Sequence, residues 1–246
     1  MTPDELLAEA CPQIRDLGWA HYFVAETMNQ GTELGLDGFK FYFLGRGGVL
    51  GDVDASMVQA AFGYFEPTVL ADAWSTGSEI CSPSVAAAVF WECAAELGRR
   101  KLTGVEGLDA FVAAADKVND AADPTALTLY AGARRMPLAD DAPARAMQLI
   151  SLLREFRGSA HLLALRAVGL DSVVAHAISR PNDMAMFGWA DDAAGDISDG
   201  QREQREEAEL LTDEIVLPAY LALDEDEQQA LLDGLRHIGP LLTSAG

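Results

Sequence analysis

Apolar residues recur at helical spacing along most of the 246-residue chain, with glycine, proline and capping residues between the runs. The first run, residues 12–32, carries Ile14, Leu17 and Tyr22 on roughly one face, and Gly35 is a suitable stop. Stretches rich in Val, Ile, Thr and aromatic residues are short. The pattern therefore predicts an all-α, mostly helical protein, with further helices over residues 55–65, 67–74, 83–97, 105–118 and 124–135.

Two neighbouring segments lack a clear period. The aromatic run of residues 39–44 fits either a buried extended segment or a short helix. Residues 45–51 hold four glycines, but their spacing matches neither G-x-x-x-x-G-K-[ST] nor G-x-G-x-x-G. We therefore favour a structural loop over a phosphate-binding one, because glycine permits unusual backbone angles.

A helix-turn-helix pattern follows in the second half of the chain. Residues 143–157 form a long apolar-periodic run that Gly158 interrupts, and Ser159 is suited to cap a second helix reaching residue 168. Gly169 then provides a turn, and Asp171 is placed to cap a helix over residues 172–179. Two helices joined by a glycine turn are typical of the helix-turn-helix arrangement.

A break at residues 136–141 divides the chain into two predicted units. The first, residues 1–138, is an N-terminal helical unit. The second, residues 139–246, contains the helix-turn-helix and ends in two amphipathic helices, about residues 206–221 and 225–238.

Charge argues against nucleic acid as a partner. The net formal charge is −22, and lysine occurs only at positions 40, 101 and 117. Residues 144–180 carry five arginines against two acids, whereas residues 190–233 carry fifteen acids against two arginines. A field of this sign repels phosphate backbones and anionic lipid. Within the predicted recognition helix, only Ser172, His176 and Ser179 are available to read bases.

Composition indicates a cytoplasmic protein without a membrane span. Half of the residues are apolar and the mean hydropathy is +0.07, but the longest apolar runs fall far short of the ~20 residues that a membrane helix needs. The first residues are acidic and lack the features of an export signal. The three cysteines, Cys11, Cys81 and Cys93, have no C-x-x-C spacing and are expected to be buried thiols.

A set of short segments spread over nearly the whole chain has a familiar pattern: residues 20–23, 41–53, 61–67, 152–161, 188–189 and 211–213. The most specific part is the string Arg-Glu-Phe-Arg-Gly-Ser-Ala-His. Together these segments resemble the SalK-like helix-turn-helix family of actinobacteria.

The resemblance implies two winged-helix-like units in tandem and no established activity. A recognition helix, a two-stranded wing and a return need roughly 30 residues at usual element lengths. Only residues 190–211 are present for them, and these are rich in aspartate without β alternation. We therefore expect the second wing to be reduced or absent.

Candidate chemistry centres on the same string. In an unbroken helix Arg154, Arg157 and His161 would share one face, beside Glu155, as an anion-binding or acid–base cluster. The alternative, which we favour, is that these groups make buried hydrogen bonds at the helix joint. The full set of candidate ligand-binding residues is His21, Tyr22, Arg46, Phe65, Glu155, Arg157, His161 and Trp189. No histidine has a second ligand at metal spacing, so no metal site is predicted, and the sequence identifies no cofactor.

Three functions are compatible with these features. The first is a non-enzymatic protein, derived from a winged-helix scaffold, that binds a small molecule or a partner protein. The second is a DNA-binding transcription regulator. The third is an enzyme of specialised metabolism that uses Glu155, Arg157 and His161. We favour the first, and expect a homodimer because helix-turn-helix proteins commonly pair.

Overall fold

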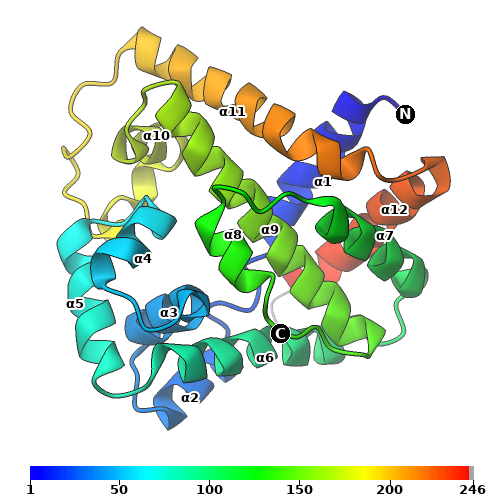
Figure 1. The fold of residues 1–246 in the computed structure, drawn as a ribbon, viewed down its shortest axis with the longest axis horizontal. Helices are drawn as coiled ribbons and strands as arrows, with labels where there is room; N and C mark the ends of the chain where they lie inside the picture. Colours follow the sequence, from blue (N-terminus) through cyan, green and yellow to red (C-terminus); the bar gives the residue numbers. More distant parts are fainter. Residues whose placement is uncertain (244–246) are drawn as a thin grey trace.

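A computed structural model describes residues 1–243 and contains twelve α-helices, three 3-10 turns and, within those residues, no strand (Figure 1). The prediction of an all-α protein is confirmed. The helices are α1 (Pro3–Leu17), α2 (Ala25–Glu33), α3 (Gly38–Gly47), α4 (Ala55–Phe62), α5 (Pro67–Ser78), α6 (Pro83–Leu102), α7 (Leu108–Ala121), α8 (Thr128–Ala133), α9 (Ala142–Ala167), α10 (Ser172–Ser179), α11 (Asp199–Tyr220) and α12 (Glu225–Thr243). The 3-10 turns are η1 (Gly48–Leu50), η2 (Pro181–Asp183) and η3 (Ala185–Phe187).

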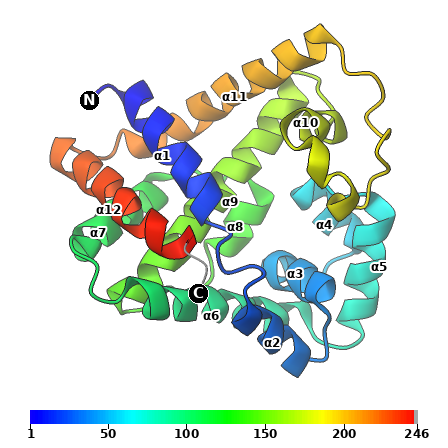
Figure 2. The ribbon, with the colours of Figure 1, turned by 180° about the vertical axis from the view of Figure 1, so that it is seen from behind.

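Helix α9 is the centre of the molecule. It packs against α6, α11, α7, α1 and α8, and Figures 1 and 2 show it crossing the middle in both views. The core around it takes residues from both sides of position 138, for example Leu6 and Phe111 together with Phe156 and Leu235. A second, aromatic core fills the space between α3, α4, α5 and α6. The division into units at residue 138 stays a prediction.

The predicted break at Gly158 is wrong, because α9 is one helix of 26 residues. Asp141 caps its start by accepting the N–H of Ala144 at 3.1 Å, and the helix then runs through Gly158 and Ser159 without interruption. A glycine inside a helix costs only about 1 kcal/mol. Burial of Phe156 and Ala160 on either side outweighs that cost. Arg154, Arg157 and His161 therefore do lie on one continuous helix.

The predicted helix over residues 12–32 is also wrong, because the chain turns between α1 and α2. A capping box between Thr2 and Glu5 starts α1 early, and Pro12 lies inside it. The helix ends at Leu17, and an added Cβ at the C-cap residue Gly18 would lie 2.5 Å from the Cβ of Arg154. The glycine lets the end of α1 approach α9, which brings Arg15 beside the string identified from the sequence.

Residues 39–50 are helical rather than a loop, and Gly51 follows them with a φ of +85°. Helix α3 continues through Gly47 and η1 follows it, so the prediction of a structural loop at residues 45–51 is wrong. An added Cβ at Gly45 would lie 2.5 Å from Phe90, and one at Gly48 would lie 2.0 Å from the carbonyl oxygen of Pro83. The glycines thus allow α3 and η1 to pack closely on α6. Arg46 lies between two of them, Gly45 and Gly47, in the chain.

The helix-turn-helix joint is confirmed. Gly169 adopts a φ of +75° at the end of α9, and α10 leaves at a bend of 115°. Asp171 occupies the N-cap position of α10, although its side chain makes no capping hydrogen bond. Residues 180–198 then pass α4 and α5 as two 3-10 turns and irregular chain before α11 begins (Figure 1). The expectation that the second wing is reduced or absent agrees with this segment, which holds no strand.

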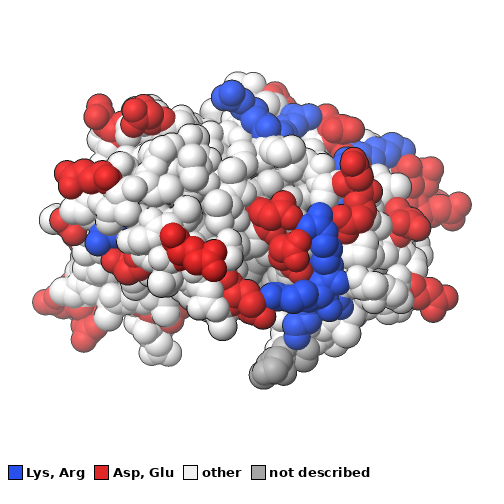
Figure 3. All heavy atoms as spheres, turned by 90° about the horizontal axis from the view of Figure 1, so that it is seen from below, with Lys and Arg blue, Asp and Glu red and all other residues white. Residues whose placement is uncertain are grey.

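Among the described residues, no single helix is long and apolar enough to cross a membrane. The pairs α5–α6 and α9–α10 reach that length and composition only when each is joined across its bend. The surface carries interspersed charges of both signs. On the face seen in Figure 3, basic side chains lie beside acidic ones. Arg99, for example, forms ion pairs with Glu92, Glu96 and Asp141.

Candidate functional site

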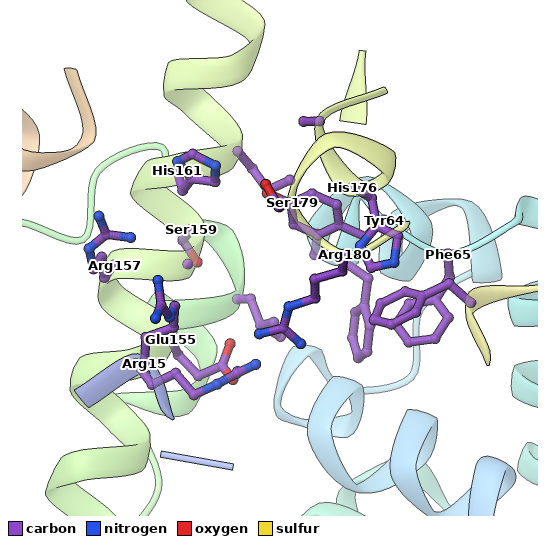
Figure 4. Close-up of a pocket in the computed structure, with 18 of the residues that line it drawn as sticks. Arg15, Tyr64, Phe65, Glu155, Arg157, Ser159, His161, His176, Ser179 and Arg180 are labelled. Atoms are coloured by element: carbon purple, nitrogen blue, oxygen red, sulfur yellow. The ribbon is translucent and has the colours of Figure 1, made fainter. Parts of the chain in front are cut away.

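A cavity of about 340 Å³ lies where α1, α3, α4, α9, α10 and α11 converge (Figure 4). One wall is the middle of α9, and the opposite wall comes from α10 and the chain around Tyr64 and Phe65. Because the helix-turn-helix bend folds α10 back toward α4, the joint itself creates the space between these walls.

The cavity concentrates positive charge in an otherwise acidic protein. Three carboxylates line it, from Asp16, Glu155 and Glu209, so the formal charge of its wall is +3 while that of the whole chain is −22. The arginines that line it are Arg15, Arg46, Arg154, Arg157, Arg180 and Arg205. The local field therefore favours an anion in a molecule whose outer field repels one.

The first group of charges, which we call the Glu155 cluster, consists of Tyr22, Arg46, Arg154 and Glu155. Arg46 donates to both carboxylate oxygens of Glu155 at 2.8 Å, and Tyr22 and Arg154 donate to Oε1 at 2.9 and 3.0 Å. Burial acts to raise the pKa of Glu155, but the charge and hydrogen bonds of Arg46, helped by Arg154 and Tyr22, lower it to about 2. Glu155 is thus ionised and its acceptor capacity is largely used within the protein.

The second group, the Glu209 cluster, consists of Arg157, Arg205, Glu209 and Asp213. Arg157 donates to Glu209 at 2.6 Å and to Asp213 at 3.2 Å, and Arg205 pairs with the other oxygen of Glu209 at 2.6 Å. Burial acts to raise the pKa of Glu209, but the hydrogen bond and charge of Arg157 lower it to about 2. This cluster joins α9 to α11 along one side of the cavity.

One arginine of the wall has no acidic partner. Within residues 1–243 no carboxylate pairs with the exposed side chain of Arg180, which extends from the α10 side toward α9 (Figure 4). This guanidinium is therefore suited to receive an anion. The Nε atoms of Arg154 and Arg157 also lack a hydrogen bond within the described chain, but they are buried and are not accessible from the cavity.

Aromatic rings form the opposite wall. Phe187 of η3 stacks on Phe65, with 4.4 Å between the ring centroids, and contacts His176, with 4.1 Å between the ring centroids. Trp189 donates from Nε1 to the carbonyl of Tyr64 at 2.7 Å, which holds residues 187–189 against this wall. Burial lowers the pKa of His176, and the charge of Arg180 adds to the effect. The wall therefore combines flat apolar surface with a neutral imidazole.

His161 lies on α9 beside the Glu209 cluster. Its Nδ1 is 2.8 Å from the hydroxyl of Thr212 on α11. Burial lowers its pKa to about 4, so the ring is neutral at pH 7.

Of the eight residues proposed from the sequence, five line the cavity: Arg46, Phe65, Glu155, Arg157 and His161. Tyr22 lies behind them, in contact with Glu155, and Trp189 lies behind Tyr64. His21 is outside the cavity wall. It packs against Tyr22 and Phe90 at 4.8 and 4.9 Å, both of its ring nitrogens lack a partner, and burial lowers its pKa to about 3.

Other cavity residues were not singled out from the sequence. They include Arg15, Tyr64, Arg180, Arg205 and Glu209, which come from four separate segments of the chain. Arg205 and Glu209 sit four residues apart on one helix face, which is a recognisable ion-pair spacing. That spacing alone does not indicate which face of α11 meets α9.

The polar side chains of α10 are directed at other parts of the protein. Ser172 donates to the carbonyl of Gly63, and Ser179 accepts from Nε of Arg205 at 3.0 Å. His176 is buried. Each residue that the sequence offered for reading bases is therefore engaged or covered in this structure.

Among residues 1–243, no three or more His, Cys, Asp or Glu side chains are grouped so that they could hold a metal ion.

Comparison with known proteins identifies a family for this chain but no individual relative. No curated protein and no solved structure matches it. The model of the Helix-turn-helix family matches residues 9–246, nearly the whole chain. This match agrees with the joint seen between α9 and α10, and the protein belongs to the Helix-turn-helix family.

Proposed function

We propose that this protein binds a small organic anion with a flat apolar or aromatic body, in the cavity between α9 and α10. The observation that carries the proposal is the six-arginine wall inside a chain of charge −22. Arginine is the residue that best matches carboxylate and phosphate geometry, and its charge acts more strongly in a partly closed site than in water.

Most of the arginines in the wall already form ion pairs within the protein, which favours a ligand of small negative charge. Glu155 and Glu209 already neutralise much of the wall, which leaves Arg180 as the exposed arginine without an acidic partner among the described residues. A single carboxylate fits this surplus better than a polyphosphate. The stacked rings of Phe65, Phe187 and His176 supply the surface for the rest of the ligand.

Catalysis by the residues considered from the sequence has less support. Glu155 is held by two arginines and a tyrosine, and its low pKa makes it a poor base. Arg157 is engaged with α11 rather than with Glu155. We therefore propose binding without a reaction.

A DNA-binding role is likewise less supported. Ser172 and Ser179 make internal hydrogen bonds and His176 is covered, so α10 offers little to a DNA groove. We also propose that the chain is SalK-like and actinobacterial, on the residues that suggested it. Of its string, Arg154, Glu155, Arg157 and His161 line the cavity. The cytoplasmic location and the homodimer stay predictions.

Isothermal titration with a matched pair of probes tests the proposal. The pair is 2-naphthoate, which is flat and anionic, and 2-naphthamide, its neutral counterpart. We expect measurable binding of the carboxylate and at least tenfold weaker binding of the amide. Equal binding of the two, or no binding of either, would overturn the proposal.

Arg180→Gln locates the site, because that side chain faces the cavity and makes no ion pair with the described residues. We expect it to weaken 2-naphthoate binding about three- to tenfold, as loss of one partly exposed charged contact costs about 1 kcal/mol. Arg166→Gln is the matched control, since Arg166 is 78% exposed at the end of α9 and does not line the cavity. Equal losses in both variants would indicate a general charge effect instead of this site.

A further inference from the structure

We infer that the ligand of this cavity carries, besides its anionic group, a hydroxyl or N–H group that donates a hydrogen bond to Nε2 of His161. The inference rests on the proposed function and specifies the ligand class: a hydroxy- or amino-substituted aromatic acid. It comes from the hydrogen bonds that hold the imidazole ring.

Three groups in series determine which nitrogen of His161 carries the proton. The hydroxyl of Thr212 donates to the carbonyl of Ala208 at 2.5 Å, one turn earlier on α11. A hydroxyl has one hydrogen, so Thr212 accepts the bond that links it to Nδ1 of His161 at 2.8 Å. Nδ1 is therefore the protonated nitrogen, and Nε2 holds a lone pair.

That lone pair is the ring's remaining polar function, and the protein leaves it unused. His161 is 8% exposed, and within the described chain no donor bonds its Nε2. The ring lines the cavity, and its other nitrogen is turned to α11 (Figure 4). Because Nε2 is not one of the fully enclosed polar atoms that lack a partner, it is accessible from the cavity, and a ligand there can donate to it.

The protonation state of the His161 ring determines whether Nε2 accepts or donates a hydrogen bond. Burial lowers the pKa of His161 to about 4, and the charges of Arg205 and Arg157 act in the same direction, opposed by Glu209. At neutral pH the ring is therefore an acceptor at Nε2. Such a weak base accepts a hydrogen bond readily but removes a proton poorly, which agrees with a binding role.

Thr212 fixes the ring as well as the tautomer. It is fully buried on α11, and the neighbouring Arg157–Glu209 pair holds α11 against α9 at the same level. The acceptor is thus preorganised, which reduces the entropy lost on binding. A ligand donor at this point gains a bond without rearrangement of the wall.

The test compares naphthoates that differ only in the donor. Affinities for 2-naphthoate, 3-hydroxy-2-naphthoate, 6-hydroxy-2-naphthoate and 6-methoxy-2-naphthoate are measured by titration calorimetry. We expect at least one hydroxy isomer to bind about tenfold more tightly than 2-naphthoate, and the methoxy compound, which cannot donate, to show no gain.

His161→Phe keeps a ring of similar size and removes the acceptor. We expect it to abolish the gain from the hydroxyl while 2-naphthoate still binds, which also shows that the cavity is intact. His237→Phe, at an exposed histidine outside the cavity, is the control and should preserve the gain. A gain that persists in His161→Phe, or the absence of any gain in the wild-type protein, would overturn the inference. If no naphthoate binds, the proposed function itself fails.

Nuclear magnetic resonance of the imidazole nitrogens tests the tautomer without a ligand. A long-range ¹H–¹⁵N spectrum at pH 7 should show His161 with a protonated Nδ1 and an unprotonated Nε2. In Thr212→Val the preference should be lost, because nothing then accepts from Nδ1. An Nε2-protonated ring in the wild-type protein would contradict the inference.

Discussion

The Glu155 and Glu209 clusters use the same chemistry in different surroundings. In both, a carboxylate on the cavity wall is held by two arginines, and in both the pKa of the carboxyl is lowered to about 2. The side chain of Glu155 is only 7% exposed, whereas that of Glu209 is 34% exposed. The partners of Glu155 come from α3, α9 and the turn before α2, while those of Glu209 come from α9 and α11.

Because the two clusters differ in burial, their ion pairs should contribute differently to the stability of the fold. Removing one partner of a buried ion pair leaves an uncompensated charge, which is strongly destabilising. A pair that is one-third exposed to solvent is screened and contributes much less. The Glu155 cluster is therefore expected to contribute more to the stability of the fold than the Glu209 cluster does.

Glu155→Gln should have the largest effect on stability. It leaves the charges of Arg46 and Arg154 buried without a counter-ion, and we expect a loss of about 3–5 kcal/mol in the free energy of unfolding. Urea unfolding followed by circular dichroism measures the change. A loss below about 1 kcal/mol would mean that the two clusters do not differ as described.

Stability should fall as the pH decreases from 6.5. Burial lowers the pKa of His21 to about 3 and that of His161 to about 4 from the usual 6.5. The unfolded chain therefore binds more protons than the folded one in the interval from pH 6.5 to 4, and folding weakens there by an amount on the order of a few kcal/mol. Below pH 4.5 Glu155 adds to the loss, since its contribution is present above that pH and disappears as the pH falls toward 2.

Single histidine variants show how much each cluster's neighbouring histidine contributes to the pH dependence of stability. His21→Phe, next to the Glu155 cluster, should flatten the curve more than His161→Phe, because His21 is more deeply buried and has no hydrogen-bond partner. Thermal unfolding at pH 4, 5.5 and 7 provides the comparison. The opposite order would contradict it.

Glu209→Gln should cost about 1 kcal/mol of stability or less, because Glu209 is one-third exposed. The same change releases Arg157 and Arg205 from their counter-ion, so affinity for 2-naphthoate should rise a few-fold. Scanning calorimetry of the variant and the wild-type protein measures the loss of stability. Titration calorimetry of the same pair measures the gain in affinity for 2-naphthoate. Weaker binding of 2-naphthoate would show that Glu209 positions the arginines rather than competing for them.

Gly158→Ala should have the smallest effect, a gain in stability of about 0.5–1 kcal/mol. Gly158 is inside α9, between Glu155 and His161, and an added Cβ meets no atom within 4 Å. The measurement is the midpoint of urea unfolding. Gly48→Ala is the contrast, because its Cβ would meet the carbonyl of Pro83 and should destabilise. A loss of stability in Gly158→Ala would indicate that α9 is not continuous.

Parts of the site were predictable because they share one helix. Arg154, Arg157 and His161 stand at positions i, i+3 and i+7, so helical periodicity places them on one face of a continuous helix, with Glu155 beside them. Arg46 was predicted to take part, but its distance of 109 positions from Glu155 concealed the bidentate pair between them. Arg205, Glu209 and Thr212 were missed, since only the packing of α11 on α9 brings the first two to the cavity and Thr212 to His161.

The amino-acid sequence by itself determined the local features: the all-α class, the turn at Gly169 and the beginning of α6 at Pro83. These follow from capping, glycine conformation and apolar spacing, which act within a few residues. Tertiary structure alone decided the unbroken course of α9, the packing use of the glycines in α3 and the arginine-lined cavity. Such features depend on burial and charge pairing between segments up to a hundred or more positions apart, and local sequence patterns do not contain that information.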